Sequence, residues 1–238
     1  VCSIKPKRQM FRGYNWLEHI HWNPAGTRFA FLHRWRPKGD SSHATRLFTA
    51  DANGTNVFMF PDSRFYSHMA WHNDKHLTIW ALTNSSKNRT VSKFRRNPGL
   101  RSCIRPPVRL LRLCLGNASL NRFLPNGAFF DYEDQTHKAT VVGENKLVQD
   151  GHNSWTRDKR WMLADTYQDK QNYRYLLLYD NAQNELHTLG RFYSPYNDSV
   201  YRYDLHPRFD LSEQYIIVDS AHAGPKRQTY ILGHDRFS

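Results

Sequence analysis

Apolar and polar positions recur in one repeated pattern along the chain. A histidine is followed three residues later by Trp or Phe, then by a polar turn, and then by a short apolar stretch. Four segments have this pattern: His19-Ile20-His21-Trp22, His68-Met69-Ala70-Trp71, His152-Asn153-Ser154-Trp155 and His206-Pro207-Arg208-Phe209. Short apolar stretches on both sides of a polar turn predict a β-hairpin. Each unit is therefore expected to open as strand, turn, strand.

Each unit continues with further strand-like stretches. In the first unit these are residues 46–50 and 56–60, separated by Asp51-Ala52-Asn53-Gly54, and the third unit has equivalents at 175–179 and 185–189. Four short antiparallel strands are typical of one blade of a β-propeller. The 14% aromatic content also favours strands. We predict an all-β fold, a β-propeller fragment of four to five four-stranded blades.

The repeat divides the chain into blades of unequal length. The expected divisions are the tail of a preceding blade at 1–18, blades at 19–61, 62–145 and 146–199, and an incomplete final blade at 200–238. Propeller blades usually repeat at about 40 to 50 residues, and the second unit is far longer than that. The excess predicts an insert at about 84–124 inside the second blade.

The net charge of +13 is concentrated in this insert. Residues 84–124 contain eight Arg and two Lys without Asp or Glu, whereas the other 197 residues carry 24 basic and 21 acidic side chains. The segment has neither strand alternation nor a helical pattern, and we expect an exposed or disordered loop. Its abrupt change of composition leaves open that it is not native coding sequence. Nucleic-acid binding through it is an unlikely third function, because Phe94 and Phe123 are its only aromatic residues.

Other compositional features exclude little. No run of 18 or more apolar residues occurs, so no membrane helix and no membrane partner are expected. Three cysteines, without Cys-x-x-Cys spacing, argue against a disulfide scaffold and against a cysteine zinc site. They leave the compartment open, with the cytoplasm slightly favoured, and the sequence gives no oligomeric state.

The repeat histidines are the candidates for chemistry. The first strand of each blade lines the central channel of a propeller, so His19, His68, His152 and His206 are expected to converge on one axis. Imidazoles gathered in this way suit a divalent ion such as Mn, Fe, Ni or Zn, and Asp204 can add an oxygen ligand. The structural alternative is that each histidine only hydrogen-bonds the neighbouring blade.

A second matched set lies at the ends of the second strands. It consists of His33, Asp165 and Asp219, each 13 or 14 residues after a repeat histidine. Asp and His often bond the amides of turns, and for the two aspartates a turn cap is the expected role. His33, beside Arg34, is less easily explained as a cap.

Several motifs together resemble a known family. They are Phe31-Leu32-His33-Arg34-Trp35, Ser67-His68, Asp150-Gly151-His152, Asp165-Thr166-Tyr167-Gln168-Asp169, Asp204-Leu205-His206-Pro207-Arg208-Phe209 and Asp219-Ser220-Ala221-His222-Ala223-Gly224. Outside 84–124, the chain resembles the oligogalacturonate lyase-like propellers, a WD40-like and TolB-like family. The resemblance implies a seven-bladed ring, of which this chain is a fragment. It also implies β-elimination on uronic-acid oligosaccharides, so an anionic oligosaccharide is the expected partner.

The resemblance also implies roles for particular residues. A divalent metal, with Mn²⁺ favoured, is expected at His68, His152, Asp204 and His206. His33 and Arg202 are assigned to catalysis, His33 as the base, and Arg34, Arg208 and Tyr167 are assigned to substrate binding. Two positions depart from the family: Asp204 stands where the lyases have a second His, and Tyr201 where they have a Gln ligand. These departures bear directly on metal binding, and a non-catalytic sugar- or protein-binding platform is the alternative function.

Overall fold

A computed structural model describes most of the chain. The described residues are Ile4, Met10, and 13–38, 43–61, 65–82, 127–194, 202–224 and 226–233. The predicted insert at 84–124 lies outside these residues, as does Tyr201. The statements below on strands and contacts refer to the described parts.

The first blade is a four-stranded antiparallel sheet in chain order. It contains β1 (Gly13–Trp22), β2 (Arg28–Pro37), β3 (Ala44–Asp51) and β4 (Phe58–Met59). β1 is longer than the repeat pattern indicates, because residues 13–18 already pair with 32–37 of β2. The β1 register shifts between Glu18 and His21, where His19 has a φ of 53°.

The second blade has the same order. It contains β5 (Tyr66–Trp71), β6 (His76–Leu82), β7 (Gly127–Glu133) and β8 (Ala139–Val142). β6 pairs with β7 in antiparallel register from His76↔Glu133 to Leu82↔Gly127. The long interval in the repeat therefore separates two strands that are direct neighbours in the sheet.

Two further blades complete the described fold. The third contains β9 (Asn153–Trp155), β10 (Trp161–Asp165), β11 (Tyr173–Asp180) and β12 (Glu185–Tyr193). The last contains three described strands, β13 (Arg208–Phe209), β14 (Tyr215–Ser220) and β15 (Gln228–Gly233).

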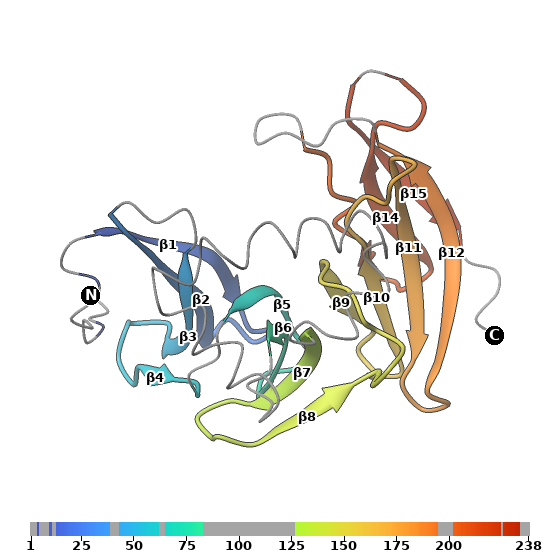
Figure 1. The fold of residues 1–238 in the computed structure, drawn as a ribbon. Helices are drawn as coiled ribbons and strands as arrows, with labels where there is room; N and C mark the ends of the chain where they lie inside the picture. The colour runs from blue at the N-terminus through green and yellow to red at the C-terminus, as the bar shows by residue number, and fades with distance from the viewer. Residues whose placement is uncertain are drawn as a thin grey trace.

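The four sheets follow one another around a common centre. β1 contacts β5, β5 contacts β9 and β9 contacts β13, so the first strands of successive blades are neighbours. In Figure 1 the blades form an arc, from β1 on the left to β15 on the right. The all-β class and the β-propeller are confirmed, and the arc is consistent with a fragment of a larger propeller.

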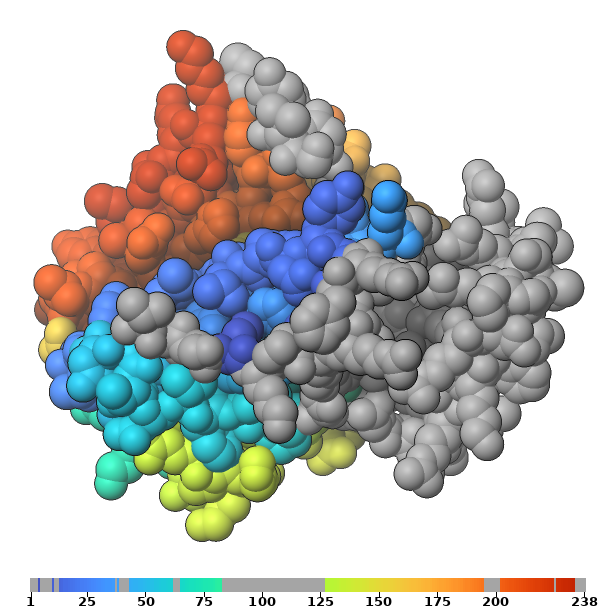
Figure 2. All heavy atoms as spheres, turned by 90° about the vertical axis from the view of Figure 1, so that its left-hand side faces the viewer, coloured from blue at the N-terminus to red at the C-terminus, as the bar shows by residue number. Residues whose placement is uncertain are grey.

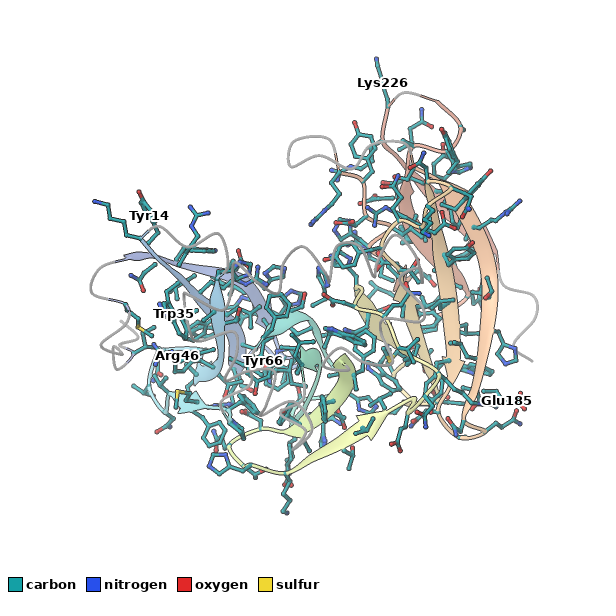
Figure 3. The ribbon with its side chains drawn as sticks, viewed as in Figure 1. Tyr14, Trp35, Arg46, Tyr66, Glu185 and Lys226 are labelled. Atoms are coloured by element: carbon teal, nitrogen blue, oxygen red, sulfur yellow. The ribbon has the colours of Figure 1, made fainter. Side chains whose placement is uncertain are left out.

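Apolar cores fill the spaces between successive blades. The first and second blades share a core around Leu32, Leu47 and Ile79, in which Tyr66 lies between the two sheets (Figure 3). The second and third meet around Phe129 and Met162, while the third and last enclose the buried side chains Leu163, Leu176, Leu178, Leu205, Ile216 and Val218. Removal of this apolar surface from water is the main force that holds one blade against the next.

Polar contacts fix the angle between blades. The indole nitrogen of Trp71 donates to the carbonyl of His21, at 2.9 Å, in the preceding blade. Trp155 donates in the same way to Oγ1 of Thr78, at 3.0 Å. In the second and third blades the Trp of the repeat is thus a link to the blade before it.

The first blade has an exposed inner strand. Trp22, the equivalent of Trp71 and Trp155, is 53% exposed, and Tyr14, Leu17 and Ile20 of β1 are also exposed. Figure 2, viewed from the side of the first blade, shows β1 in blue above β3 and β4 in cyan, with parts of the third and last blades in orange and red behind.

The interblade cores give a stability prediction. Leu163→Ala is expected to lower the free energy of unfolding by about 2–5 kcal/mol, because Leu163 is fully buried between the third and last blades. Urea unfolding followed by tryptophan fluorescence measures this change. The control Leu211→Ala removes an 87% exposed side chain and should change stability by less than about 0.5 kcal/mol. Equal effects of the two substitutions would contradict the assigned core.

Candidate metal and substrate site

Four imidazoles from four blades form a continuous row at the centre of the arc. The ring centroid of His19, in β1, lies 5.8 Å from that of His68, in β5. His68 lies 3.9 Å from His152, which directly precedes β9, and His152 lies 4.1 Å from His206, which precedes β13. The structure therefore brings the four repeat histidines together, and we call them the histidine row.

Each member of the row has a carboxylate beside its Nδ1 atom. The Nδ1 to carboxylate distance is 3.2 Å for His19 and Glu18, and 3.0 Å for His68 and Asp150. It is 3.1 Å for His152 and Asp165, and 3.4 Å for His206 and Asp219. The contacts of His68 and His152 are hydrogen bonds. A carboxylate that holds the Nδ1 proton in this way leaves the Nε2 lone pair free, as in the carboxylate–histidine–metal arrangement.

Burial keeps members of the row neutral. It lowers the pKa of His206, and the neighbouring His152 lowers it further. Burial also lowers the pKa of His19 to about 4, against the opposing effect of Glu18. His21 belongs to the same environment, because burial, His152 and His68 all lower its pKa. Neutral imidazoles are the form that binds a metal ion.

Three donors are close enough to share one cation. His152, Asp204 and His206 each offer a ligand atom, and these atoms lie within 4.8 Å of one another. Two imidazoles and a carboxylate suit divalent ions of the first transition row, so the donor set fits the expected metal. His68 is not part of this group, although its ring contacts that of His152.

Asp204 is also the partner of two arginines. Nη1 of Arg174 lies 2.7 Å from one carboxylate oxygen, and Nε of Arg202 lies 2.8 Å from the other. Arg174 is only 1% exposed, whereas the Arg202 side chain is 45% exposed. Asp204 therefore shares its charge with two guanidinium groups, which makes it a weaker metal ligand than an unpaired carboxylate.

Tyr167 joins this arginine pair to the histidine row. The guanidinium carbons of Arg174 and Arg202 lie 5.9 and 5.7 Å from its ring centroid, and His68 lies 5.9 Å from it. Burial, and then the nearby Asp150 carboxylate, raises the pKa of Tyr167 to about 12. The hydroxyl therefore stays protonated and can donate a hydrogen bond to an anionic ligand.

Arg34 lies on the side of the first blade that faces the second. Its Nη1 atom is 2.5 Å from Glu18, and its guanidinium lies 5.6 Å from the ring centroid of Phe65. Tyr167 and Asp150 are near enough to influence its ionisation. Arg34, Tyr167 and Arg202 are thus cationic and hydrogen-bonding groups around the histidine row.

His33 points to the opposite face of β2 from Arg34, since neighbouring strand residues alternate in direction. Its Nδ1 atom lies 3.2 Å from Nη2 of Arg46, and its ring stacks on Trp35. Figure 3 shows Trp35 and Arg46 together in the first blade. Burial, and then the charge of Arg46, lowers the pKa of His33 to about 4.

Arg208 lies exposed on β13, opposite Ile217, and Tyr201 is outside the described residues. Asp165 bonds loop amides, as expected of a cap, and also lies beside Nδ1 of His152, while Asp219 lies beside Nδ1 of His206. The sequence interpretation assigned no role to Glu18, Asp150 or Arg174. The position of Asp150, directly before Gly151-His152, could have indicated a role in the site. Arg174 lies among apolar strand residues, and nothing in the sequence around it indicates such a role.

Comparison with solved structures shows the fold. The chain is similar to an oligogalacturonate lyase in complex with manganese, with a TM-score of 0.59 and 16% identity over 92% of this chain and 48% of the lyase. It is also similar to the propeller domain of the trilobed protease from Pyrococcus furiosus, with a TM-score of 0.50 and 10% identity over 95% of this chain and 57% of that one. A third neighbour, described as a TolB from Agrobacterium tumefaciens, has a TM-score of 0.51 and 11% identity over 94% of this chain and 60% of that one.

The shared fold is a β-propeller. At these identities the likeness extends to the fold alone, because lyase and protease propellers match this chain with similar scores. The chain spans about half the length of the lyase. No protein-family model matches the sequence, and no curated protein matches it. Within the described ranges, no helix has the length and apolar character needed to span a bilayer.

The lowered histidine pKa values predict a pH effect on stability. Between pH 6.5 and about 4, the unfolded chain protonates His19 and His33 while the folded protein keeps them neutral. The unfolded state then binds more protons, so the free energy of unfolding falls as the pH is lowered through this window. Urea unfolding at pH 7 and pH 4.5 measures the fall. It should be smaller in His33→Gln, and an identical fall in both proteins would contradict a neutral His33.

Proposed function

We propose that this chain is a carbohydrate-active propeller of the oligogalacturonate lyase type, which acts on uronic-acid oligosaccharides by metal-assisted β-elimination. The observation that carries the proposal is the pair His152 and His206. They come from neighbouring blades, each has a carboxylate beside Nδ1, and Asp204 offers an oxygen within 4.8 Å of a ligand atom of each. The manganese in the neighbouring lyase supports Mn²⁺ as the favoured ion.

His152, Asp204 and His206 would hold this ion. When bound, a divalent cation neutralises the uronate carboxylate and so makes the adjacent C5 proton more acidic. The remaining requirements are a base for that proton and cationic groups that hold an anionic sugar in place.

We assign the base to His68. Its Nδ1 atom is 3.0 Å from Asp150, an arrangement in which a carboxylate orients an imidazole. Its ring is 3.9 Å from that of His152, directly beside the metal group. In the proposed reaction His68 takes the C5 proton, the electrons of that bond form a C4–C5 double bond, and the C4–O bond breaks as the leaving oxygen gains a proton from water.

His33 is a less suitable base than the sequence-based assignment supposed. Its Nδ1 atom faces Arg46, and its pKa of about 4 makes it a weak proton acceptor at neutral pH. Its contacts with Arg46 and Trp35 instead belong to the packing of the first blade.

Arg34, Arg202 and Tyr167 are assigned to substrate binding. Arg202 is half-exposed and can pair with a sugar carboxylate in a bidentate manner. Tyr167 adds a donor hydroxyl and an aromatic surface between His68 and the arginines. Arg208, exposed on β13, is left as a candidate contact for a more distant sugar unit.

The first test of the proposal measures Mn²⁺ binding together with product formation. Isothermal titration calorimetry is expected to give one Mn²⁺ site, and short oligogalacturonates should yield an unsaturated uronide, followed by its ultraviolet absorbance. His206→Ala should weaken Mn²⁺ binding by about 100-fold or more, because losses of outer partners alone cost 10- to 100-fold. Product formed equally well after treatment with a chelator, or wild-type protein that binds no Mn²⁺, would contradict it.

The second test separates the two candidate bases. His68→Ala is expected to lower kcat by about 100- to 10,000-fold, the usual contribution of a general base, while Mn²⁺ affinity changes little. His33→Ala, the matched control, should retain most of the wild-type kcat if it folds. A greater loss of kcat in His33→Ala than in His68→Ala would reverse the assignment.

A non-catalytic sugar-binding platform is the second candidate function. The paired arginines on Asp204 favour it, because they reduce the charge available to a metal. Under this alternative the protein binds oligogalacturonate, and Arg202→Ala weakens that binding, but no unsaturated product appears with any divalent ion.

A further inference from the structure

We infer that Asp165 is a positioning residue that holds the two histidine loops of the candidate metal site as one unit. The inference rests on the proposed function, because it concerns how His152 and His206 are presented to a cation. Neither comparison nor sequence pattern assigned this role, and the cap expected for Asp165 involved its own turn only.

The two histidines need support beyond the sheets. His152 directly precedes β9, which is three residues long, and His206 lies two residues before β13, which is two residues long. So few strand residues give little hydrogen bonding to fix what precedes them. His206 also has a φ of 45°, a left-handed conformation that residues with a side chain rarely adopt without support.

The Asp165 carboxylate contacts both loops. One oxygen accepts the backbone N–H of His152 at 2.6 Å, and the other accepts the backbone N–H of His206 at 3.1 Å. The second oxygen also lies 3.1 Å from Nδ1 of His152. A single side chain therefore fixes one imidazole and the backbone of two loops from neighbouring blades.

The backbone of Asp165 holds the first loop in addition. Its N–H donates to the carbonyl of His152 at 3.1 Å. A Cβ at Gly151 would lie 1.9 Å from the Asp165 carbonyl oxygen, so only glycine allows the loop to approach this closely. Any larger residue at position 151 would therefore push the loop away from Asp165.

Asp165 is buried, which makes its geometry rigid. The residue is 2% exposed, and it lies at the end of β10, a strand within the third blade. Its carboxylate accepts these bonds from a fixed place at the end of a buried strand.

Asp219 occupies the matched position in the last blade but has a narrower role. Its Oδ2 atom lies 3.4 Å from Nδ1 of His206, and its N–H donates to the carbonyl of Leu205. These contacts stay inside one blade. Asp165, in contrast, couples two blades, so a change at Asp165 should disturb both ligands together.

The first experiment compares Asp165→Asn with Asp180→Asn in the full chain. Asp180 is an equally buried aspartate of the third blade, but it caps the amides of Ala182 and Gln183 in the turn after β11. Asp165→Asn is expected to weaken Mn²⁺ binding by about 10- to 100-fold in calorimetry. Asp180→Asn should lower the unfolding midpoint without this loss. Equal Mn²⁺ affinities in the two variants would overturn the inference.

A metal-free measurement separates this inference from the proposed function. In the wild-type protein the His152 and His206 amides should be protected from hydrogen exchange, although both lie outside strands. In Asp165→Asn at least one of the His152 and His206 amides should exchange at least about tenfold faster, because the asparagine side chain keeps only one accepting oxygen and its NH₂ group cannot accept the second bond. If wild type binds no Mn²⁺, the proposed function fails while this result still decides the role of Asp165. Exchange of both wild-type amides at the rate of unprotected loops would overturn the inference about Asp165. This measurement uses the wild-type protein, so it does not depend on whether a variant folds.

Discussion

The site depends on carboxylates that hold imidazoles in place. Among these carboxylates, Asp165 makes bonds to two histidine loops. It is fully enclosed between two blades and bonds the backbone of both histidine loops as well as one imidazole ring. Burial of a charge is costly unless hydrogen bonds compensate for it. Because several do so here, the third and last blades have one relative position in which His152 and His206 lie side by side.

Packing between blades brings the whole row to that position. Apolar clusters hold successive sheets face to face, and the indoles of Trp71 and Trp155 link the second blade to the first and the third blade to the second. The repeat tryptophan and the repeat histidine therefore have different roles, one between blades and one in the site. The tryptophans of the second and third blades hydrogen-bond the preceding blade, and the repeat histidines of neighbouring blades lie next to one another.

The fold could be predicted from the sequence, and so could the closeness of the four repeat histidines, since equivalent positions in a propeller repeat face the same axis. The sequence was not sufficient for the carboxylates, because Asp150 comes from the loop of the next unit and Asp165 resembles an ordinary turn cap. The surroundings of His33 could not be predicted either, because its neighbour in the chain, Arg34, points to the opposite face of β2. Arg46, which together with burial lowers the pKa of His33, is its partner only across the sheet.

The central claim is that imidazoles from separate blades share one cation at the axis. An anomalous-scattering map of crystals grown with Mn²⁺ tests it most directly. The account predicts one strong peak within coordination distance of His152 and His206, on the side away from Asp165 and Asp219. A map without a peak there, or with peaks only at outer surfaces of the blades, would contradict it.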